Sequence, residues 1–305
     1  MNISDFESMN VIKYNFPLST VCTMKTGGNA KYAFSPATVR ELQEIVLFLR
    51  NEQIKFIVIG NGSNVIFSDK GYDGAVVLTA NLKDIKDVEV SKNDNERYIY
   101  VGAGCSLTSV ALKMSKQGFC GLEFAYGIPA SIGGAVYMNA GAYGGEMNDI
   151  IYEVEYLDDK GNIKQLCNNP SENYFTYRHS FFADHPEYII TGAVLKLTKA
   201  EGVDPMQLAE KNMTSRREKQ PLEYPSCGSA FKRPQGYFAG ALIEQAGLKG
   251  KNIGGAYVSE KHAGFIVNKG GATTTDIVEL IKHVQSTVYK LYGVTLEPEI
   301  RIIED

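Results

Sequence analysis

The alternation of hydrophobic and polar positions predicts a small α/β unit in the first quarter of the chain. Apolar side chains recur at helical spacing over residues 38–51, which indicates an amphipathic helix. Residues 56–59 form a continuous apolar run that ends at Gly60, and residues 75–78 form a second such run. Short apolar runs next to glycine are typical of buried strands. A helix and strands at this spacing predict an α/β unit over about residues 20–82.

The pattern then changes to one that predicts a mixed α+β unit. Residues 88–90 and 98–101 are apolar and flank a polar stretch, which predicts an antiparallel pair of strands. Helical periodicity returns over residues 107–114. Residues 151–166 consist of two apolar runs around the turn sequence Asp-Asp-Lys-Gly-Asn, which predicts a hairpin. Residues 189–197 supply another predicted strand.

The last third of the chain is predicted to be a separate part that begins at Gly-Val-Asp-Pro, residues 202–205. Glycine followed by proline is typical of a boundary at which a new helix starts, and this helix is expected to end near residue 220. Apolar stripes predict further helices over residues 238–246 and 275–292. The pattern as a whole predicts an α+β protein in three parts, residues 1–82, 83–203 and 204–305.

The composition is that of a folded globular protein, with 44% hydrophobic and 22% charged residues in a chain of 305. A formal net charge of −4 argues against a nucleic-acid-binding surface, which would be basic. The first ten residues include acidic side chains and no apolar core, so we do not expect a signal peptide. No run approaches the roughly 20 apolar residues of a membrane span. We expect a cytoplasmic monomer with no nucleic-acid partner and no insertion into membranes.

The cysteines and histidines indicate neither disulfides nor a metal. Five cysteines are scattered without a Cys-x-x-Cys pair, which in the absence of a secretion signal is typical of reduced thiols. The four histidines show no metal-binding spacing. We therefore expect no structural or catalytic metal.

Three glycine-rich turns point to a phosphate-bearing ligand. Gly-Asn-Gly-Ser-Asn at residues 60–64 follows an apolar run, Gly-Ala-Gly-Cys-Ser at residues 102–106 lies between a strand and a helix, and residues 127–145 are rich in small side chains. Glycine permits positive φ and lets a ligand approach backbone N–H groups, which together can bind an anion. A tight turn without a ligand explains the first turn equally well, but three such turns predict a cradle for a dinucleotide.

The first two turns do not complete the Gly-x-Gly-x-x-Gly/Ala fingerprint of a Rossmann fold, because Val65 and Leu107 occupy its last position. The sequence therefore carries no separate fingerprint for a nicotinamide dinucleotide. A nicotinamide that takes part in the reaction is therefore expected to visit the ligand bound in this cradle transiently.

Ordered motifs along most of the chain resemble one known family. They are Lys-Thr-Gly-Gly-Asn-Ala (25–30), Gly-Asn-Gly-Ser-Asn (60–64), Gly-Leu-Glu-Phe-Ala (121–125), Gly-Ile-Pro (127–129), Gly-Gly-Ala (133–135), Asn-Ala-Gly-Ala-Tyr-Gly (139–144), Tyr-Arg (177–178), Ser-Cys-Gly-Ser-Ala-Phe (226–231), Lys-His-Ala-Gly-Phe-Ile-Val-Asn (261–268) and Glu-Pro-Glu-Ile (297–300). Together they resemble the MurB family, the UDP-N-acetylenolpyruvoylglucosamine reductases, from about residue 25 to residue 303.

The resemblance implies an FAD-binding fold of the vanillyl-alcohol-oxidase type in two subdomains, residues 1–82 and 83–203, followed by an α/β substrate-binding domain over residues 204–305. It implies non-covalent FAD, NADPH as co-substrate, and reduction of UDP-N-acetyl-3-O-(1-carboxyvinyl)-glucosamine to UDP-N-acetylmuramate in peptidoglycan precursor synthesis. The residues expected to bind FAD are Gly60, Asn61, Gly62, Ser63, Asn64, Gly127, Ile128, Ser131, Gly133, Gly134, Asn139, Gly141 and Ala142.

Two positions depart from the family pattern. Ala130 replaces the glycine that usually follows Ile-Pro, which is tolerable unless this position needs a positive φ. Residues 179–189 are too few to hold the longer tyrosine-bearing loop that closes over the substrate in one branch of the family. The chain therefore resembles the shorter branch.

The resemblance assigns proton donation to Ser229 and contact with the enol intermediate to Arg178 and Glu299. Hydride addition to an enolpyruvyl ether builds negative charge next to a carboxylate, so the site needs cationic or hydrogen-bonding groups and an acid. A guanidinium suits a carboxylate, and a glutamic acid can donate a hydrogen bond only if burial raises its pKa. Without the family, Ser229 would be an ordinary turn serine, Arg178 a surface or ion-pair arginine, and Glu299 a solvated edge residue.

Arg216 and Lys219 are the expected substrate-binding residues. They are three apart, so a helix places them on one face, where they could meet a UDP diphosphate. The alternative is a basic, solvated helix end. Tyr126 and Tyr143 are expected in the core, and His262 is expected to be structural.

Two other functions stay open from the sequence. One is an FAD-dependent oxidase of the same fold that reacts with oxygen and an alcohol. The other is a non-catalytic protein that binds a nucleotide sugar. The presence of Arg178, Ser229 and Glu299 together disfavours both.

Overall fold

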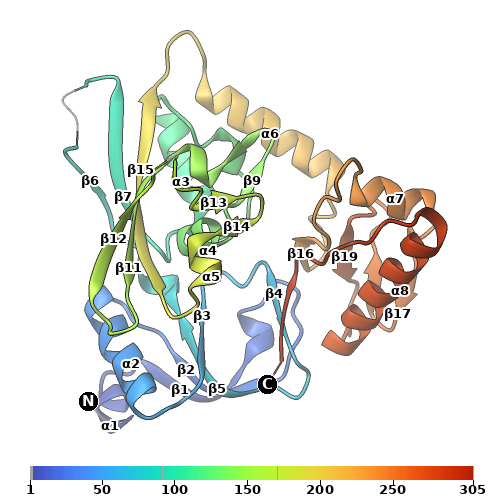
Figure 1. The fold of residues 1–305 in the computed structure, drawn as a ribbon, viewed down its shortest axis with the longest axis horizontal. Coiled ribbons are helices and arrows are strands. Elements are labelled where there is room, and N and C mark those ends of the chain that lie inside the picture. Colours follow the sequence, from blue (N-terminus) through green and yellow to red (C-terminus); the bar gives the residue numbers. More distant parts are fainter. Residues whose placement is uncertain (1–2, 91–92, 170, 305) are drawn as a thin grey trace. The chain divides into compact units, whose positions relative to one another are not determined.

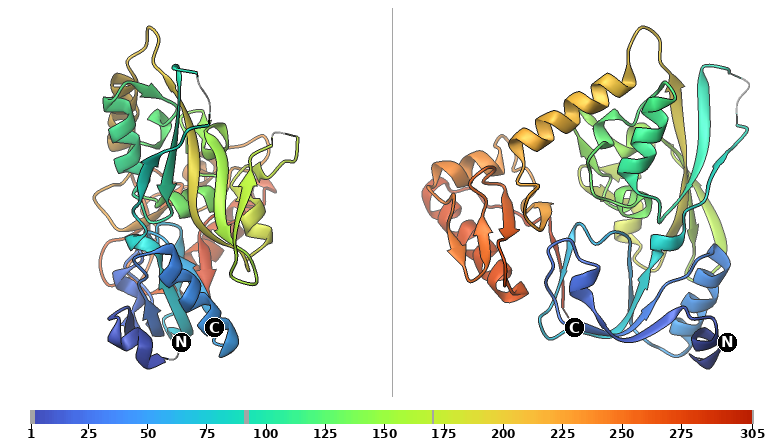
Figure 2. Two further views of the ribbon diagram at one scale, coloured as in Figure 1. Left: turned by 90° about the vertical axis from the view of Figure 1, so that its left-hand side faces the viewer. Right: turned by 180° about the vertical axis from the view of Figure 1, so that it is seen from behind.

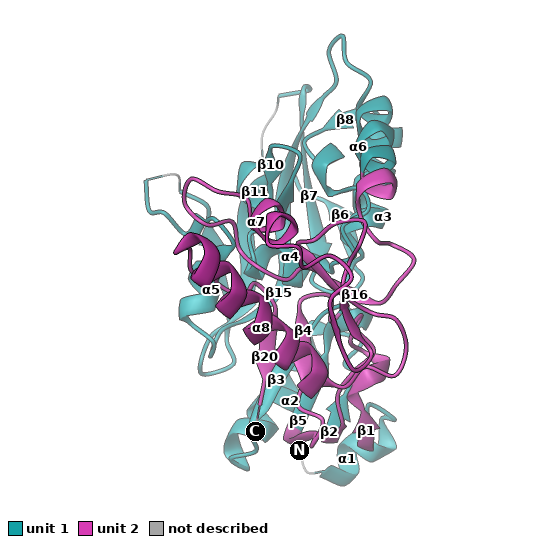
Figure 3. Ribbon diagram, turned by 90° about the vertical axis from the view of Figure 1, so that its right-hand side faces the viewer, with its two compact units in different colours: residues 1–13, 32–61, 75–215 teal, residues 14–31, 62–74, 216–305 magenta. Residues whose placement is uncertain are grey.

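The computed structural model describes residues 3–90, 93–169 and 171–304. By its contacts the chain forms two compact units that interleave along the sequence (Figure 3). Unit 1 comprises Met1–Lys13, Tyr32–Asn61 and Ala75–Ser215, and unit 2 comprises Tyr14–Lys31, Gly62–Gly74 and Arg216–Asp305. The division into residues 1–82, 83–203 and 204–305 stays a prediction.

The first sheet has four strands in the order β1-β2-β5-β3 (Figure 1). Strands β3 (Phe56–Ile59) and β5 (Tyr72–Leu78) are parallel neighbours, which confirms the strands predicted from the two apolar runs. Strands β1 (Ile12–Pro17) and β2 (Asn29–Phe34) complete the sheet. The predicted start of this unit at residue 20 is therefore wrong. Only one residue of β1 is buried, so this strand lacks the apolar pattern that would reveal it.

Two helices of unit 1 close its smaller core. Helix α2 (Val39–Asn51) confirms the predicted amphipathic helix, and the side chain of Thr38 caps it by accepting from the Glu41 backbone N–H at 3.1 Å. Helix α1 (Ile3–Ser8) contributes Phe6, which is fully buried. The sequence analysis did not predict this helix.

The second sheet of unit 1 has six antiparallel strands, with the main path β12-β11-β15-β7-β6 and β8 paired to β15. Their bounds are Ile85–Asp87 (β6), Glu96–Gly102 (β7), Phe119–Cys120 (β8), Ile151–Leu157 (β11), Ile163–Cys167 (β12) and Ile189–Lys199 (β15). The hairpin β11–β12 confirms the prediction for residues 151–166.

The strand predicted at residues 88–90 is wrong by three positions. The strand that pairs with β7 is β6, in which Ile85 lies opposite Val101. Val88 adds only one backbone hydrogen bond, to the carbonyl of Tyr98. All three residues of β6 are exposed, so local apolarity favours the wrong segment. Residues 91 and 92 of the polar stretch that follows lie outside the described residues.

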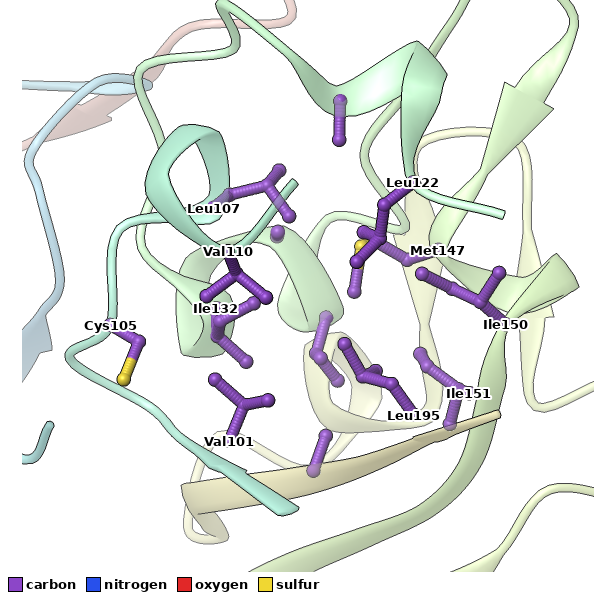
Figure 4. Close-up of a cluster of buried hydrophobic side chains, with 14 of the residues drawn as sticks. Val101, Cys105, Leu107, Val110, Leu122, Ile132, Met147, Ile150, Ile151 and Leu195 are labelled. Carbon is purple, nitrogen blue, oxygen red and sulfur yellow. The ribbon is translucent and has the colours of Figure 1, made fainter. Parts of the chain in front are cut away.

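Helices α3 (Leu107–Lys116) and α4 (Ile132–Tyr137) lie on one face of the six-stranded sheet (Figure 1, Figure 2). Their apolar faces meet inward-pointing strand residues in the largest core of unit 1 (Figure 4). Val101 and Leu195 from the strands are fully buried there, together with Leu107 from α3. The helix predicted over residues 107–114 is thereby confirmed.

The remaining elements of unit 1 are short. They are the hairpin strands β9 (Gly141–Ala142) and β10 (Gly145–Glu146), the hairpin strands β13 (Phe175–Thr176) and β14 (His179–Ser180), and helix α5 (Phe181–Asp184). The longer helix α6 (Pro205–Lys219), whose residues from Arg216 on belong to unit 2, starts at the proline and ends beside residue 220, as predicted.

Unit 2 contains a four-stranded antiparallel sheet in the order β16-β19-β18-β17 and a parallel pair, β4 with β20. Their bounds are Val65–Phe67 (β4), Ser226–Ser229 (β16), Asn252–Ile253 (β17), Ala256–Val258 (β18), Phe265–Asn268 (β19) and Arg301–Ile303 (β20). Helices α7 (Ala239–Gln245) and α8 (Thr274–Tyr292) confirm the two predicted C-terminal helices. The apolar faces of these two helices pack into the core of this unit.

Helix α8 is anchored at both ends. Its first N–H groups, from Thr274 and Thr275, donate to the carboxylate of Asp69 at 2.8 Å each. Gly293 ends the helix in the left-handed conformation, with φ of +68°. Among the described residues, no helix is long and apolar enough to cross a membrane.

Candidate active site

The glycine turns of unit 1 meet one another. Residues 103–107 run beside residues 130–133, with Leu107 N–H donating to Ala130 O and Gly133 N–H to Ala103 O, both at 2.9 Å. Gly60, at the end of β3, lies so near α4 that an added Cβ would be 2.0 Å from Ser131 Oγ. The parts of the three turns that lie in unit 1 therefore meet one another, as a shared cradle requires.

Small residues in these turns are required by the packing. A Cβ on Gly133 would lie 2.9 Å from the Cβ of Ala103, and Ser131 Oγ accepts from Gly134 N–H at 3.2 Å to cap α4. Asn61 Nδ2 donates to Pro129 O at 2.6 Å. Small side chains are also what the close approach of an extended diphosphate and a planar ring requires.

The other predicted FAD-binding residues of unit 1 lie on both sides of α4. Gly127, with φ of +90°, donates its N–H to Thr108 Oγ1, which in turn donates to Ile128 O. Ala142 lies in strand β9, where it pairs with Gly145. The sequence analysis missed Thr108, because a single threonine on a helix carries no signal of a turn-holding role.

Gly62, Ser63 and Asn64 belong to unit 2, so the five-residue turn 60–64 is divided between the units. Gly62 has φ of +60°, and a Cβ there would lie 1.8 Å from Val21 O. Asn64 Nδ2 donates to Glu299 O at 3.1 Å. The side chain of Asn64 thus binds the backbone of Glu299, a candidate catalytic residue.

Arg178 lies at the tip of the β13–β14 hairpin. Its φ of +56° is in the left-handed region, which bulky residues seldom adopt. Its Nη2 donates to Gly141 O at 2.8 Å, and its guanidinium carbon lies 5.2 Å from the centre of the Tyr177 ring. Arg178 is half-buried and held by these contacts, and its catalytic role stays a prediction.

Ser229 and Glu299 lie on neighbouring chain segments in unit 2. Glu299 N–H donates to Ala230 O at 2.9 Å, and Lys232 N–H donates to Glu297 O at 2.8 Å. These bonds place the two segments side by side, next to the end of β16. Sequence spacing could not predict this, because 70 positions separate the serine from the glutamate.

A bulge in β16 precedes the serine. The pairing register with β19 shifts between Ser226 and Ser229, and Gly228 within the shift has φ of +74°. Bulges of this kind redirect the side chain that follows and are common beside active sites. Ser229 is exposed and Glu299 is half-buried, and the catalytic roles of both stay predictions.

The two expected substrate-binding residues differ in exposure. Arg216 is 6% exposed and donates from Nη1 to Gln220 Oε1 at 3.3 Å, whereas Lys219 is exposed. Lys219 is exposed, which fits both a substrate contact and the alternative of a basic, solvated helix end, whereas buried Arg216 does not fit that alternative.

Three further expectations have different outcomes. Tyr126 packs partly buried against the larger core of unit 1, as expected. Tyr143 is 45% exposed at the tip of the β9–β10 hairpin, so its expected core position is wrong. Its ring leaves the core because its φ of +52° and the glycine that follows form a tight turn. Burial lowers the pKa of His262, whose Nδ1 accepts from Gly264 N–H at 3.1 Å, which fits a structural role.

The two family departures are accommodated. Ala130 is not among the described residues with positive φ, so its side chain causes no backbone strain. Residues 179–188 form strand β14, helix α5 and a turn, and β15 begins at Ile189. This compact connection is what the short stretch predicts.

The structure also brings together two cysteines that the sequence analysis treated as scattered. Cys22 and Cys227 are buried in unit 2, and both thiols donate to Val65 O, at 2.9 and 3.4 Å. A hydrogen bond with Cys227 lowers the pKa of Cys22 to about 7. All five cysteines are free. Within the described residues, no cluster of His, Cys, Asp and Glu side chains could hold a metal.

Family comparisons define the class of protein. An FAD-binding domain matches residues 30–166, and the C-terminal domain of UDP-N-acetylenolpyruvoylglucosamine reductase matches residues 220–303. Together with the glycine bed, these matches make the chain an FAD-containing oxidoreductase whose C-terminal part matches a family of its own. The predicted α+β fold class and the FAD cofactor are confirmed.

Relatives over the whole chain specify the family. The chain is 44% identical over 306 residues to the UDP-N-acetylenolpyruvoylglucosamine reductase of Lactobacillus delbrueckii subsp. bulgaricus, with 99% of each covered. It is 45% identical over 288 residues to that of Caldicellulosiruptor saccharolyticus, covering 94% of this chain and 90% of the relative. The crystal structure of the reductase (MurB) from Thermus caldophilus matches with a TM-score of 0.78 at 33% identity, covering 95% of this chain and 97% of that one. The chain belongs to the UDP-N-acetylenolpyruvoylglucosamine reductase family, which confirms the resemblance.

Proposed function

We propose that this protein uses NADPH to reduce UDP-N-acetyl-3-O-(1-carboxyvinyl)-glucosamine to UDP-N-acetylmuramate, in peptidoglycan precursor synthesis. Family membership over almost the full length of both chains carries the proposal. Bound FAD would supply the redox chemistry by taking a hydride from NADPH and passing it to the enol ether. The small-residue bed formed by Gly60, Ser131 and Gly133 supports the binding of that cofactor.

Three side chains of this chain supply the remaining chemistry. Arg178 binds the substrate carboxylate and stabilises the negative charge that develops next to it. Ser229 delivers a proton to the carbon that does not receive the hydride. Glu299 donates a hydrogen bond to the enol oxygen. The backbone bond between Ala230 and Glu299 supports a joint role for the serine and the glutamate.

Lys219 is the proposed contact of the UDP diphosphate, because its ammonium group is exposed at the last turn of α6. Arg216 is buried and hydrogen-bonded to Gln220, which supports a role in holding that turn. We also propose that the protein is cytoplasmic, because NADPH and UDP-sugars are cytoplasmic metabolites, and that it acts as a monomer. Light scattering after size-exclusion chromatography measures the oligomeric state.

The purified protein tests the proposal directly. It should be yellow with bound flavin, and NADPH consumption should depend on the enolpyruvyl sugar and yield UDP-N-acetylmuramate in equal amount. Rapid NADPH oxidation that is independent of the sugar would favour the oxidase. Binding of the sugar without turnover would favour the non-catalytic protein, and a colourless protein would overturn the cofactor assignment.

Glu299→Gln tests the role of the glutamate. The amide keeps a hydrogen-bond donor but no acidic proton. If Glu299 acts by hydrogen-bond donation, turnover should stay within about tenfold of the wild type, which corresponds to roughly 1.4 kcal/mol of barrier. A loss as large as that in Glu299→Ala would instead support obligate proton transfer.

A further inference from the structure

The β13–β14 hairpin presents Arg178 in a strained conformation. Thr176 pairs with His179, which leaves Tyr177 and Arg178 as a two-residue turn. A positive φ at the second turn position favours glycine or asparagine, whereas here it is +56° at an arginine. Strain of this kind persists only where the surrounding structure enforces it, and it is typical of functional sites.

The side chain of Asn139 holds one strand of this hairpin. It is fully buried, and its Nδ2 donates to Thr176 O at 3.0 Å. Its Oδ1 accepts from Asn148 N–H at 2.9 Å. The amide therefore connects the strand before Arg178 to the segment that carries Gly141. That segment in turn accepts the 2.8 Å hydrogen bond from the guanidinium of Arg178 through Gly141 O.

Ser180 holds the other strand of the hairpin. It is also fully buried, and its Oγ donates to Tyr137 O at 2.7 Å, at the last residue of α4. Two buried polar side chains thus fasten the two strands that flank the strained turn. An unmade hydrogen bond would leave a buried side-chain donor without a partner, which is costly, so both contacts oppose relaxation of the turn.

We infer that Asn139 is a positioning residue for the reduction of the substrate, acting through Arg178, with Ser180 as the second fastening point. The inference rests on the proposed role of Arg178. It gives Asn139 a role different from the FAD contact predicted from the sequence, because both polar atoms of its side chain are bonded to backbone groups of the protein, those of Thr176 and Asn148. Loss of the amide lets the turn relax and moves the guanidinium away from its bond with Gly141.

Asn139→Asp is the test variant. It keeps the side-chain volume and the acceptor for Asn148 N–H, but loses the donor to Thr176 O. Stopped-flow measurement separates flavin reduction by NADPH from flavin reoxidation by the enolpyruvyl sugar. We expect flavin content and the NADPH step to stay unchanged, and the sugar step to slow by about 10²-fold, the scale of a displaced positioning contact.

A double-mutant cycle separates positioning from a general structural role. If Asn139 acts through Arg178, the variant Asn139→Asp/Arg178→Ala should be no slower in the sugar step than Arg178→Ala alone. If the double variant is slower than Arg178→Ala, so that the two losses multiply, the inference is overturned. Asn212→Asp is the matched control, because Asn212 Nδ2 also donates to a backbone carbonyl, Glu123 O, at 3.0 Å in unit 1. The control should leave both steps unchanged.

The remaining outcomes are also decisive. Loss of FAD from Asn139→Asp would return this residue to the cofactor bed and overturn the inference. If this variant does not fold, Ser180→Ala takes its place in the same cycle, with the same expected pattern and without a new charge. If Arg178→Ala alone leaves the sugar step unchanged, the proposed role of Arg178 fails. If Arg178→Ala slows the sugar step and Asn139→Asp slows it further in the double variant, the role of Arg178 stands and only the inference about Asn139 fails.

Discussion

The two units of the molecule hold their candidate catalytic residues in different ways. In unit 1, Arg178 lies at a strained turn that is fastened by the side chains of Asn139 and Ser180. In unit 2, Ser229 and Glu299 lie on neighbouring segments that are joined by backbone hydrogen bonds, one of them from Glu299 N–H to Ala230 O. Hydrogen bonds from side chains are lost when the residue is replaced, whereas hydrogen bonds between backbone groups form with many different side chains. In unit 1, single substitutions should therefore change activity without lowering the free energy of unfolding. In unit 2, the free energy of unfolding should fall mainly when a substitution disturbs the backbone.

The largest effect is expected for Arg178→Asn. Turnover with the enolpyruvyl sugar should fall by about 10²–10³-fold, the usual loss when one charge-stabilising donor is removed. The free energy of unfolding should not fall and should rise by about 1 kcal/mol, because asparagine tolerates the positive φ that strains arginine. Steady-state kinetics and urea unfolding measure the two quantities. A variant that is both slow and less stable would contradict the assigned strain.

Gly62→Ala tests the dependence of unit 2 on its backbone. A Cβ at this position meets Val21 O at 1.8 Å, and φ is +60°. We expect a loss of about 2–4 kcal/mol in stability, from roughly 1 kcal/mol for the left-handed conformation and 1–3 kcal/mol for overpacking. Gly293→Ala is the control, because its φ is +68° but nothing lies within 4 Å of an added Cβ. Equal losses in both variants would show that close approach at Gly62 is unimportant.

Asp69→Asn tests an anchor in unit 2 that does depend on a side chain. Burial acts to raise the pKa of Asp69, but hydrogen bonds from Thr275 and Thr274 outweigh it and lower this pKa. The carboxylate is largely exposed, so its loss at the start of α8 should cost only about 1 kcal/mol at neutral pH. Because the folded pKa is lowered, this stability is present above the unfolded pKa of about 3.9 and is lost as the pH falls through the folded value.

Urea unfolding of the wild type and Asp69→Asn across this pH range measures the effect. The two proteins should differ at pH 7 and converge in acid. A difference that persists unchanged below pH 3 would mean that the charge of Asp69 does not stabilise the helix start.

Lys219→Ala should have the smallest effect. Removal of an exposed charge that meets a diphosphate should raise KM for the UDP-sugar by up to about fivefold at low salt, or roughly 1 kcal/mol, and less as salt screens the contact. The stability of the protein should not change. Lys211→Ala, on the same helix, is the control. An equal change in KM for both variants would indicate a general charge effect rather than a specific contact.

Much of the fold could be predicted because its signals are local. Helix α2 has an apolar stripe and a threonine cap, and α6 starts at a proline, so each carries its own boundary. Strands β1 and β6 were missed or misplaced because they are largely exposed. Their pairing depends on the neighbouring strand rather than on their own apolar residues.

The sequence by itself determined the chemistry available to this protein: glycine turns suited to FAD, and an arginine, a serine and a glutamate matched to an enol ether by family motifs. Only the tertiary structure decided how these parts are held. It divided the turn 60–64 between two units, joined the segments of Ser229 and Glu299 by backbone bonds, and directed the amide of Asn139 to the hairpin of Arg178. The local sequence determines which side chains a segment carries. Hydrogen bonds between distant positions, such as the bond between Asn139 and Thr176, 37 positions apart, depend on how the chain packs.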